Sequence, residues 1–161
     1  MAIAAKIDRQ EIENFLYKEA RLIDDGKFDE WLELFAEDAI YWAPCNRYDI
    51  DPNTEVSLIY DDKSRMRDRV WRLQSGLAYS QEPASRVRHM LSNMELVATE
   101  GDAVTISSNF GIFEVRKGVQ KTYAGRVEHH LRREGEGWKI AFKKVELLNN
   151  DDPIDNLTFL V

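Results

Sequence analysis

Cysteine is nearly absent from this sequence, since Cys45 is the only one among 161 residues. A single thiol cannot form an internal disulfide, and it cannot supply the cysteine pairs that hold structural zinc or an iron–sulfur cluster. As a nucleophile Cys45 would need an activating base, and the neighbouring sequence offers none. We therefore interpret Cys45 as an inert thiol and expect a reducing, cytoplasmic location.

Long apolar runs and an excess of basic residues are also missing. No stretch approaches the roughly 18 apolar residues of a membrane-spanning helix, and the N-terminal segment lacks the pattern of a secretory signal. The formal net charge is -7, whereas a nucleic-acid groove needs a basic patch that meets phosphates. The sequence therefore predicts a protein that binds neither membranes nor nucleic acids.

The residues that are present predict one globular domain over residues 1–161, because 43% are hydrophobic and 32% charged. The first half has the apolar spacing of helices. Asp8 precedes Glu11 by three positions, which is typical of a capping box at a helix N-terminus. Apolar residues then recur at helical spacing over positions 12–23, and Gly26 ends the predicted helix.

Three shorter elements are predicted next. Asp29 can cap a short helix whose apolar side includes Trp31. Apolar residues at positions 39–42 predict a short strand. A further helix is expected to begin after Asp61 or Asp62, either of which can act as its cap.

The second half changes to the period of strands, starting at Arg86. Just after Gly111 the apolar residues switch from even to odd positions, beginning at Phe113. A similar switch falls between Phe142 and Val145. Each change predicts a bulge, and bulges bend a sheet. Short glycine turns between the strands indicate antiparallel hairpins. The sequence thus predicts an α+β fold, in which a curved antiparallel sheet wraps as a cone around the N-terminal helices.

Four segments of the sequence carry a resemblance to a known family. They are residues 31–39 with Tyr41 and Pro44, residues 86–93, residues 137–140, and residues 155–161. In their order and spacing they resemble the small (beta) subunits of aromatic-ring-hydroxylating, Rieske non-haem iron dioxygenases. The resemblance covers nearly the whole chain.

The resemblance implies a cystatin-like, nuclear-transport-factor-like cone, a fold shared with ketosteroid isomerase and scytalone dehydratase. It implies a non-catalytic scaffold that forms a homo-trimer and stabilises a large subunit, which holds the Rieske cluster and the mononuclear iron. This chain would then contain no cofactor of its own, and the aromatic substrate stays open. The structural or interface candidates are Trp31, Arg86, His89, Asn93, Trp138, Leu157 and Phe159.

Histidine provides the alternative hypothesis, because it is the usual acid–base group near neutral pH. His129 and His130 are adjacent in a predicted strand, so they point to opposite faces and cannot both bind one metal. An inward His129 with Asp38 or Glu37 could abstract a proton beside a carbonyl, as in a self-sufficient dehydratase or isomerase. An open apolar pocket would favour that enzyme, whereas a pocket filled by aromatic rings would favour the scaffold.

Overall fold

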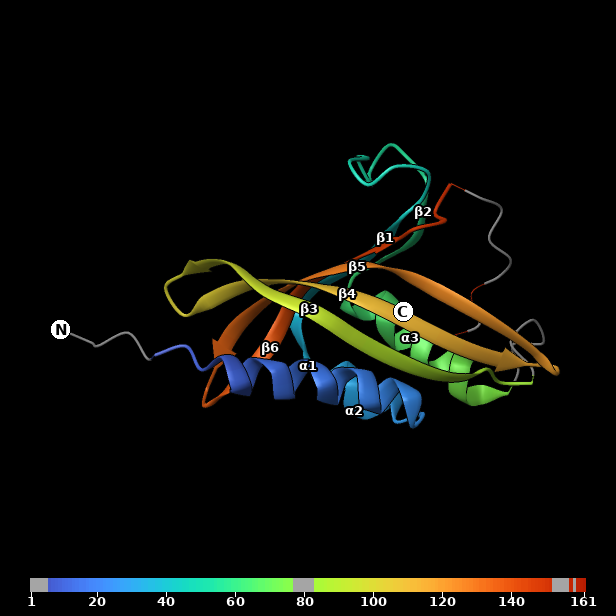
Figure 1. The fold of residues 1–161 in the computed structure, drawn as a ribbon, viewed down its shortest axis with the longest axis horizontal. Helices are drawn as coiled ribbons and strands as arrows, with labels where there is room; N and C mark the ends of the chain where they lie inside the picture. The colour runs from blue at the N-terminus through green and yellow to red at the C-terminus, as the bar shows by residue number, and fades with distance from the viewer. Residues whose placement is uncertain (1–5, 77–82, 152–156, 158) are drawn as a thin grey trace.

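The computed structural model describes residues 6–76, 83–151, 157 and 159–161. Its elements, in chain order, are α1 (Arg9–Asp24), α2 (Phe28–Glu33), β1 (Phe35–Pro44), β2 (Ser57–Asp61), α3 (Lys63–Ser75), β3 (Arg86–Glu100), β4 (Ala103–Arg116), β5 (Val119–Glu134) and β6 (Gly137–Leu147). The helices of the described chain precede the four long strands, as the sequence predicts (Figure 1). The α+β class is therefore confirmed.

Two of the predicted helix caps are present and one is wrong. The carboxylate of Asp8 accepts a hydrogen bond from the backbone N–H two positions later, at the start of α1, but the capping box is not completed because Glu11 binds Arg133 instead. Asp62 caps α3 in the same way, with the N–H three positions later. Asp29 does not cap α2, because the helix begins directly after Lys27 and has no side-chain cap. Asp29 instead lies in the first turn, where its negative charge interacts favourably with the helix dipole.

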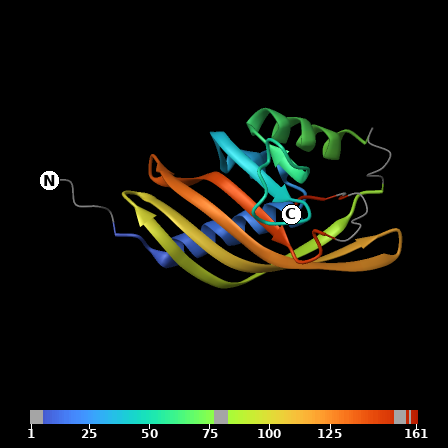
Figure 2. The same cartoon turned by 90° about the horizontal axis from the view of Figure 1, so that it is seen from above.

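The described strands form a six-stranded sheet in the order β2-β1-β6-β5-β4-β3. Neighbouring strands are antiparallel except β1 and β6, which run parallel, so the prediction of a purely antiparallel sheet is wrong there. No hairpin sets their relative direction, since β1 and β6 are separated by most of the chain. The strand predicted at residues 39–42 begins earlier, at residue 35, and β2 was not predicted. The long strands curve together as a trough, with α1 along one face (Figure 2).

The sheet contains bulges, but one of the two predicted bulges is absent and the other is shifted along its strand. Gly111 pairs in regular register with both neighbouring strands, and Phe113 simply points outward and is exposed. The irregularities lie instead in β3, between residues 92 and 95, where Asn93 has a positive φ of 52°, and between residues 96 and 98. The second predicted bulge is present in β6 but lies earlier than predicted, because the register of β6 against β5 shifts between residues 140 and 142 and Phe142 already falls after the shift.

Aromatic side chains and the end of the chain fill the space beside α1. The ring of Trp31 lies edge-on to Phe35 and Tyr41, with centroid distances of 4.8 and 5.7 Å. Leu160 and Val161 are buried in the same core. The Tyr41 hydroxyl donates to the Val161 carbonyl oxygen (2.8 Å) and accepts from the Val161 N–H (3.0 Å). The last residues are thus docked within their own chain.

A close approach between the backbones of β5 and β6 yields a prediction for Gly125 of β5. A Cβ added there would lie 2.0 Å from the backbone oxygen of Glu146 in β6. Gly125→Ala is expected to lower the free energy of unfolding by about 1–3 kcal/mol, because the two strands must shift apart. Gly111→Ala in β4 is the control, since nothing lies within 4 Å of its added Cβ. Equal results for the two variants in urea unfolding would contradict this close approach.

Candidate functional site

A buried ionic cluster joins α1 to the inner face of the sheet. Glu19 of α1 places Oε1 2.8 Å from Nε2 of His129 in β5, and Oε2 2.6 Å from Nζ of Lys143 in β6. The indole N–H of Trp31 donates to the same Oε2, at 2.9 Å. The side chains of Glu19, His129 and Lys143 are at most 5% exposed. These hydrogen bonds are therefore made away from solvent, where they are strong and their loss is costly.

The charges of this cluster follow from its geometry. Burial alone would raise the pKa of Glu19, but the Lys143 ammonium and the hydrogen bond from His129 hold it well below its usual range. Burial lowers the pKa of His129, against the opposing effect of Glu19. The pair is therefore a carboxylate and a neutral imidazole, with Nε2–H donating to Glu19 and a lone pair on Nδ1.

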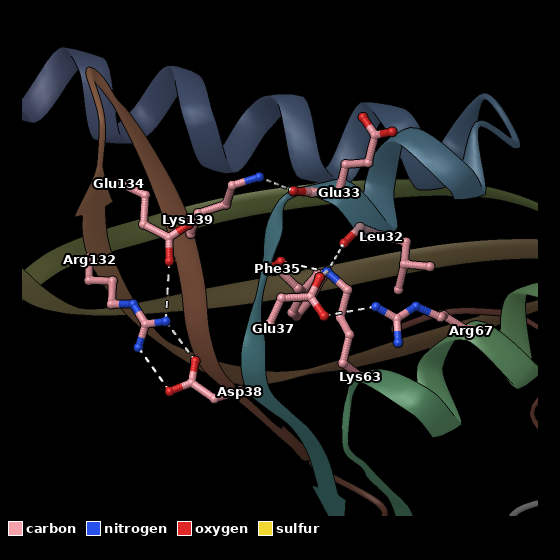
Figure 3. A network of polar contacts seen from close by, with 10 residues as sticks. All are labelled: Leu32, Glu33, Phe35, Glu37, Asp38, Lys63, Arg67, Arg132, Glu134 and Lys139. Atoms are coloured by element: carbon pink, nitrogen blue, oxygen red, sulfur yellow. Dashed lines mark hydrogen bonds and ion pairs between the residues drawn. The ribbon is translucent and has the colours of Figure 1, made fainter.

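The prediction that His129 works with Asp38 or Glu37 is wrong in its geometry. His129 does face the interior, but Asp38 and Glu37 point outward from β1 and are 70% and 81% exposed. The Arg132 guanidinium donates to both oxygens of Asp38, at 2.6 and 3.1 Å, and Arg67 donates to Glu37 at 2.9 Å (Figure 3). These two carboxylates belong to the surface.

A hollow of about 500 Å³ lies at this surface, with walls of both charges. Lys63, at the first position of α3, extends through it and donates to the carbonyl oxygens of Leu32 (2.8 Å) and Phe35 (2.6 Å) (Figure 3). Burial lowers the pKa of Lys63. Because its ammonium is bound to the end of α2 and the start of β1, we assign Lys63 a structural role.

Three predicted candidates lie on β3 and differ in their surroundings. His89 points inward, with Nδ1 2.7 Å from Oδ1 of Asp24, which also accepts the His89 backbone N–H. Asn93 occupies the left-handed position of the bulge, a conformation that asparagine tolerates better than most residues. Arg86 is exposed at the start of the strand. His89 therefore fastens the end of α1 to β3.

The remaining candidates pack against their own chain. Trp31 is fully buried, and Trp138 lies beneath the Arg133 guanidinium, 4.0 Å from the ring centroid. Phe159 packs edge-on against a tyrosine ring of β5, and Leu157 is half-buried against the core. Residues 155, 156 and 158 of the predicted tail lie outside the described residues. In the single chain, these aromatic candidates are core residues.

Glu19 and Lys143 were missed by the sequence interpretation, although the sequence contains a signal for Glu19. It occupies the apolar stripe of α1, between Leu16 and Leu22, where a charge has no place unless it is paired. Lys143 gives no such signal. The bulge in β6 changes which residues face inward, and Lys143 takes an inward position only after that shift.

The donor groups of the described residues do not fit an iron centre. His129, His89 and His130 each bind a different carboxylate, those of Glu19, Asp24 and Glu128. In the described part of the chain, no group of three or more His, Cys, Asp or Glu side chains could hold a metal ion. A Rieske cluster needs two thiolates, and the sequence has one cysteine.

A small cavity of about 20 Å³ lies between α1 and the sheet. His89 and His129 contribute to its lining, together with the side chains of Phe110 and Val161. That space accommodates about one water molecule. No helix in residues 6–76 or 83–151 is long and apolar enough to cross a membrane.

Comparisons with known proteins agree with this architecture. Residues 18–151 match the family described as ring hydroxylating beta subunit. The chain is 36% identical over 132 residues (81% of this chain, 73% of the relative) to the small oxygenase component of the p-cumate 2,3-dioxygenase system of Pseudomonas putida. It is 33% identical over 154 residues (92% and 91%) to the benzoate 1,2-dioxygenase subunit beta of Acinetobacter baylyi.

Solved structures give the same result. The beta subunit of benzoate 1,2-dioxygenase from Burkholderia mallei superimposes with a TM-score of 0.80 at 31% identity, covering 96% of this chain and 99% of that one. An NTF2-like protein with a cystatin-like fold from Novosphingobium aromaticivorans has a TM-score of 0.64 at 19% identity, covering 90% and 84%. The second likeness concerns the fold alone. On the family match and these relatives, the chain belongs to the beta subunits of ring-hydroxylating dioxygenases.

Proposed function

We propose that this chain is a non-catalytic scaffold subunit of a multi-component aromatic-ring-hydroxylating dioxygenase. The observation that carries the proposal is the filled interior. Binding pockets for small molecules usually measure about 300–1,000 Å³, whereas the cavity beside His129 measures about 20 Å³. An aromatic substrate cannot reach His129 without displacing core residues such as Phe110 and Val161. This argues against catalysis at His129 and supports a catalytic site on another subunit.

The proposed partner is a large subunit that holds the Rieske cluster and the mononuclear iron. The relatives support this, because their names describe small or beta components of dioxygenase systems. We further propose a homo-trimer in the cytoplasm. Exposed apolar side chains offer contact surface for such an assembly. They include Met90, Leu96, Val97, Phe113 and Val119.

Co-expression with the large subunit tests the scaffold role. We expect the two chains to purify together, and the large subunit to melt at a lower temperature when it is prepared without this chain. Sedimentation should give a trimer for this chain or an assembly with equal numbers of both subunits. A large subunit that is equally stable and active without this chain would contradict the proposal.

A variant of His129 separates the scaffold from the alternative, a dehydratase or isomerase in which His129 is the base. The lone pair on Nδ1 favours that alternative. His129→Ala is expected to destabilise the isolated chain by about 1–3 kcal/mol, because Glu19 loses a buried partner. Turnover per assembled oxygenase should stay within a few-fold of the wild type. His130→Ala, at the adjacent and half-exposed position, is the control and should change neither quantity.

A large loss of turnover in His129→Ala would also decide between the two hypotheses. General acid–base groups contribute about 10²–10⁴-fold to a rate. A loss of turnover on the order of a thousandfold in His129→Ala, with assembly intact, would assign catalysis to this chain and refute the scaffold proposal.

A further inference from the structure

The small interior cavity has an unusual lining, because two of its contributors are histidines with unused nitrogen atoms. Nε2 of His89 and Nδ1 of His129 are buried, and neither has a hydrogen-bond partner in the described structure. The two side chains are 5% and 1% exposed. Ile23, Phe110 and Val161 supply apolar wall beside them. A buried polar atom without a partner is uncommon in proteins and calls for an explanation.

The hydrogen bond made by the other nitrogen of each ring determines whether these atoms are donors or acceptors. His129 donates through Nε2–H to the Glu19 carboxylate, so its Nδ1 is an acceptor. His89 donates through Nδ1–H to the Asp24 carboxylate. Its Nε2 is an acceptor in the neutral ring and a donor in the protonated ring. At least one residue that lines the cavity therefore carries an acceptor nitrogen that no group of the described chain satisfies.

We propose that this cavity is a built hydrogen-bonding site for one small neutral donor, which is a water molecule in the resting protein and which donates to Nδ1 of His129. The volume of about 20 Å³ exceeds the 10–15 Å³ that one water needs on this measure. In a lining that is otherwise mostly apolar, the imidazoles of His89 and His129 supply the polar partners without which a cavity would stay dry. The guest completes the hydrogen bonding of the cluster that joins α1 to β5.

Nuclear magnetic resonance of the isotope-labelled full chain tests this site. Cross-relaxation is expected between a long-lived bound water and the ring C–H protons of His129. Absence of that signal, with the ring resonances assigned and resolved, would overturn the proposal.

Variants locate the signal. Val127 lines the cavity, whereas Val104, equally buried on the neighbouring strand, does not. Val127→Ile adds a methyl group where the water would lie and is expected to abolish the cross-relaxation, whereas Val104→Ile should preserve it. A signal retained in both variants, or lost in both folded variants, would refute this location.

A second pair of variants tests the site if Val127→Ile does not fold. Val127→Ala enlarges the cavity, and methanol as a probe is then expected to shift the ring-nitrogen resonances of His129. Val104→Ala creates a similar space without an imidazole wall, so methanol should leave His129 unchanged. A shift in neither variant, or an equal shift in both, would count against the site.

Discussion

Replacement of Glu19 by alanine is expected to lower the free energy of unfolding of this chain by about 3–5 kcal/mol. The carboxylate is 4% exposed and accepts hydrogen bonds from His129, Lys143 and Trp31. Without it, the Lys143 ammonium is left in the core with no opposite charge beside it. Urea unfolding of the isolated chain measures the effect.

Two comparisons isolate the cause of this loss. Glu13→Ala is the matched control on the same helix, because Glu13 forms an ion pair with Arg9 at the surface. Its expected effect is below about 1 kcal/mol. The double variant Glu19→Leu with Lys143→Met removes both charges and should recover much of the stability. If the double variant were as unstable as Glu19→Ala, the loss would not come from an unpaired buried charge.

The same cluster predicts a pH dependence with a definite sign. The pKa of Glu19 in the folded chain lies below its ordinary value of 4.5, so protons bind the unfolded chain more readily. The contribution of Glu19 to stability is therefore complete above pH 4.5 and is lost progressively as the pH falls below that value. The wild type should lose stability more steeply than Glu19→Gln in this acidic range, as measured by urea unfolding at each pH.

Leu160→Ala is expected to cost about 2–5 kcal/mol, the range for a large side chain removed from a packed core. Leu160 is completely buried, and its neighbour Val161 is held by two hydrogen bonds with the Tyr41 hydroxyl. These residues are thus a part of the core, which is unusual for the end of a chain. Thermal and urea unfolding of the variant measure the loss.

Leu148→Ala is the control for this prediction, because the same atoms are removed from a side chain that is 72% exposed. Its effect on the isolated chain should stay within about 0.5 kcal/mol. If the two leucine variants melted alike, Leu160 would not be docked in the core, and removal of residues 159–161 would also be tolerated.

Much of the fold could be predicted from local patterns. The caps at Asp8 and Asp62, the order of helices before strands, and the inward direction of His129 depend on residues close together in sequence. The bulge at Gly111 was predicted wrongly, because the parity change at Phe113 arises from an exposed apolar side chain. Periodicity alone cannot tell an exposed apolar residue from a shifted register.

The sequence by itself determined the family, the α+β class and the side of the sheet on which His129 lies, because alternation along a strand is a local property. Only the tertiary structure decided which carboxylate His129 meets. Asp38 is turned outward by β1, whereas α1 brings Glu19 to His129 across 110 positions of sequence. The docking of a helix on a curved sheet depends on packing over the whole core, so no local pattern specifies that contact.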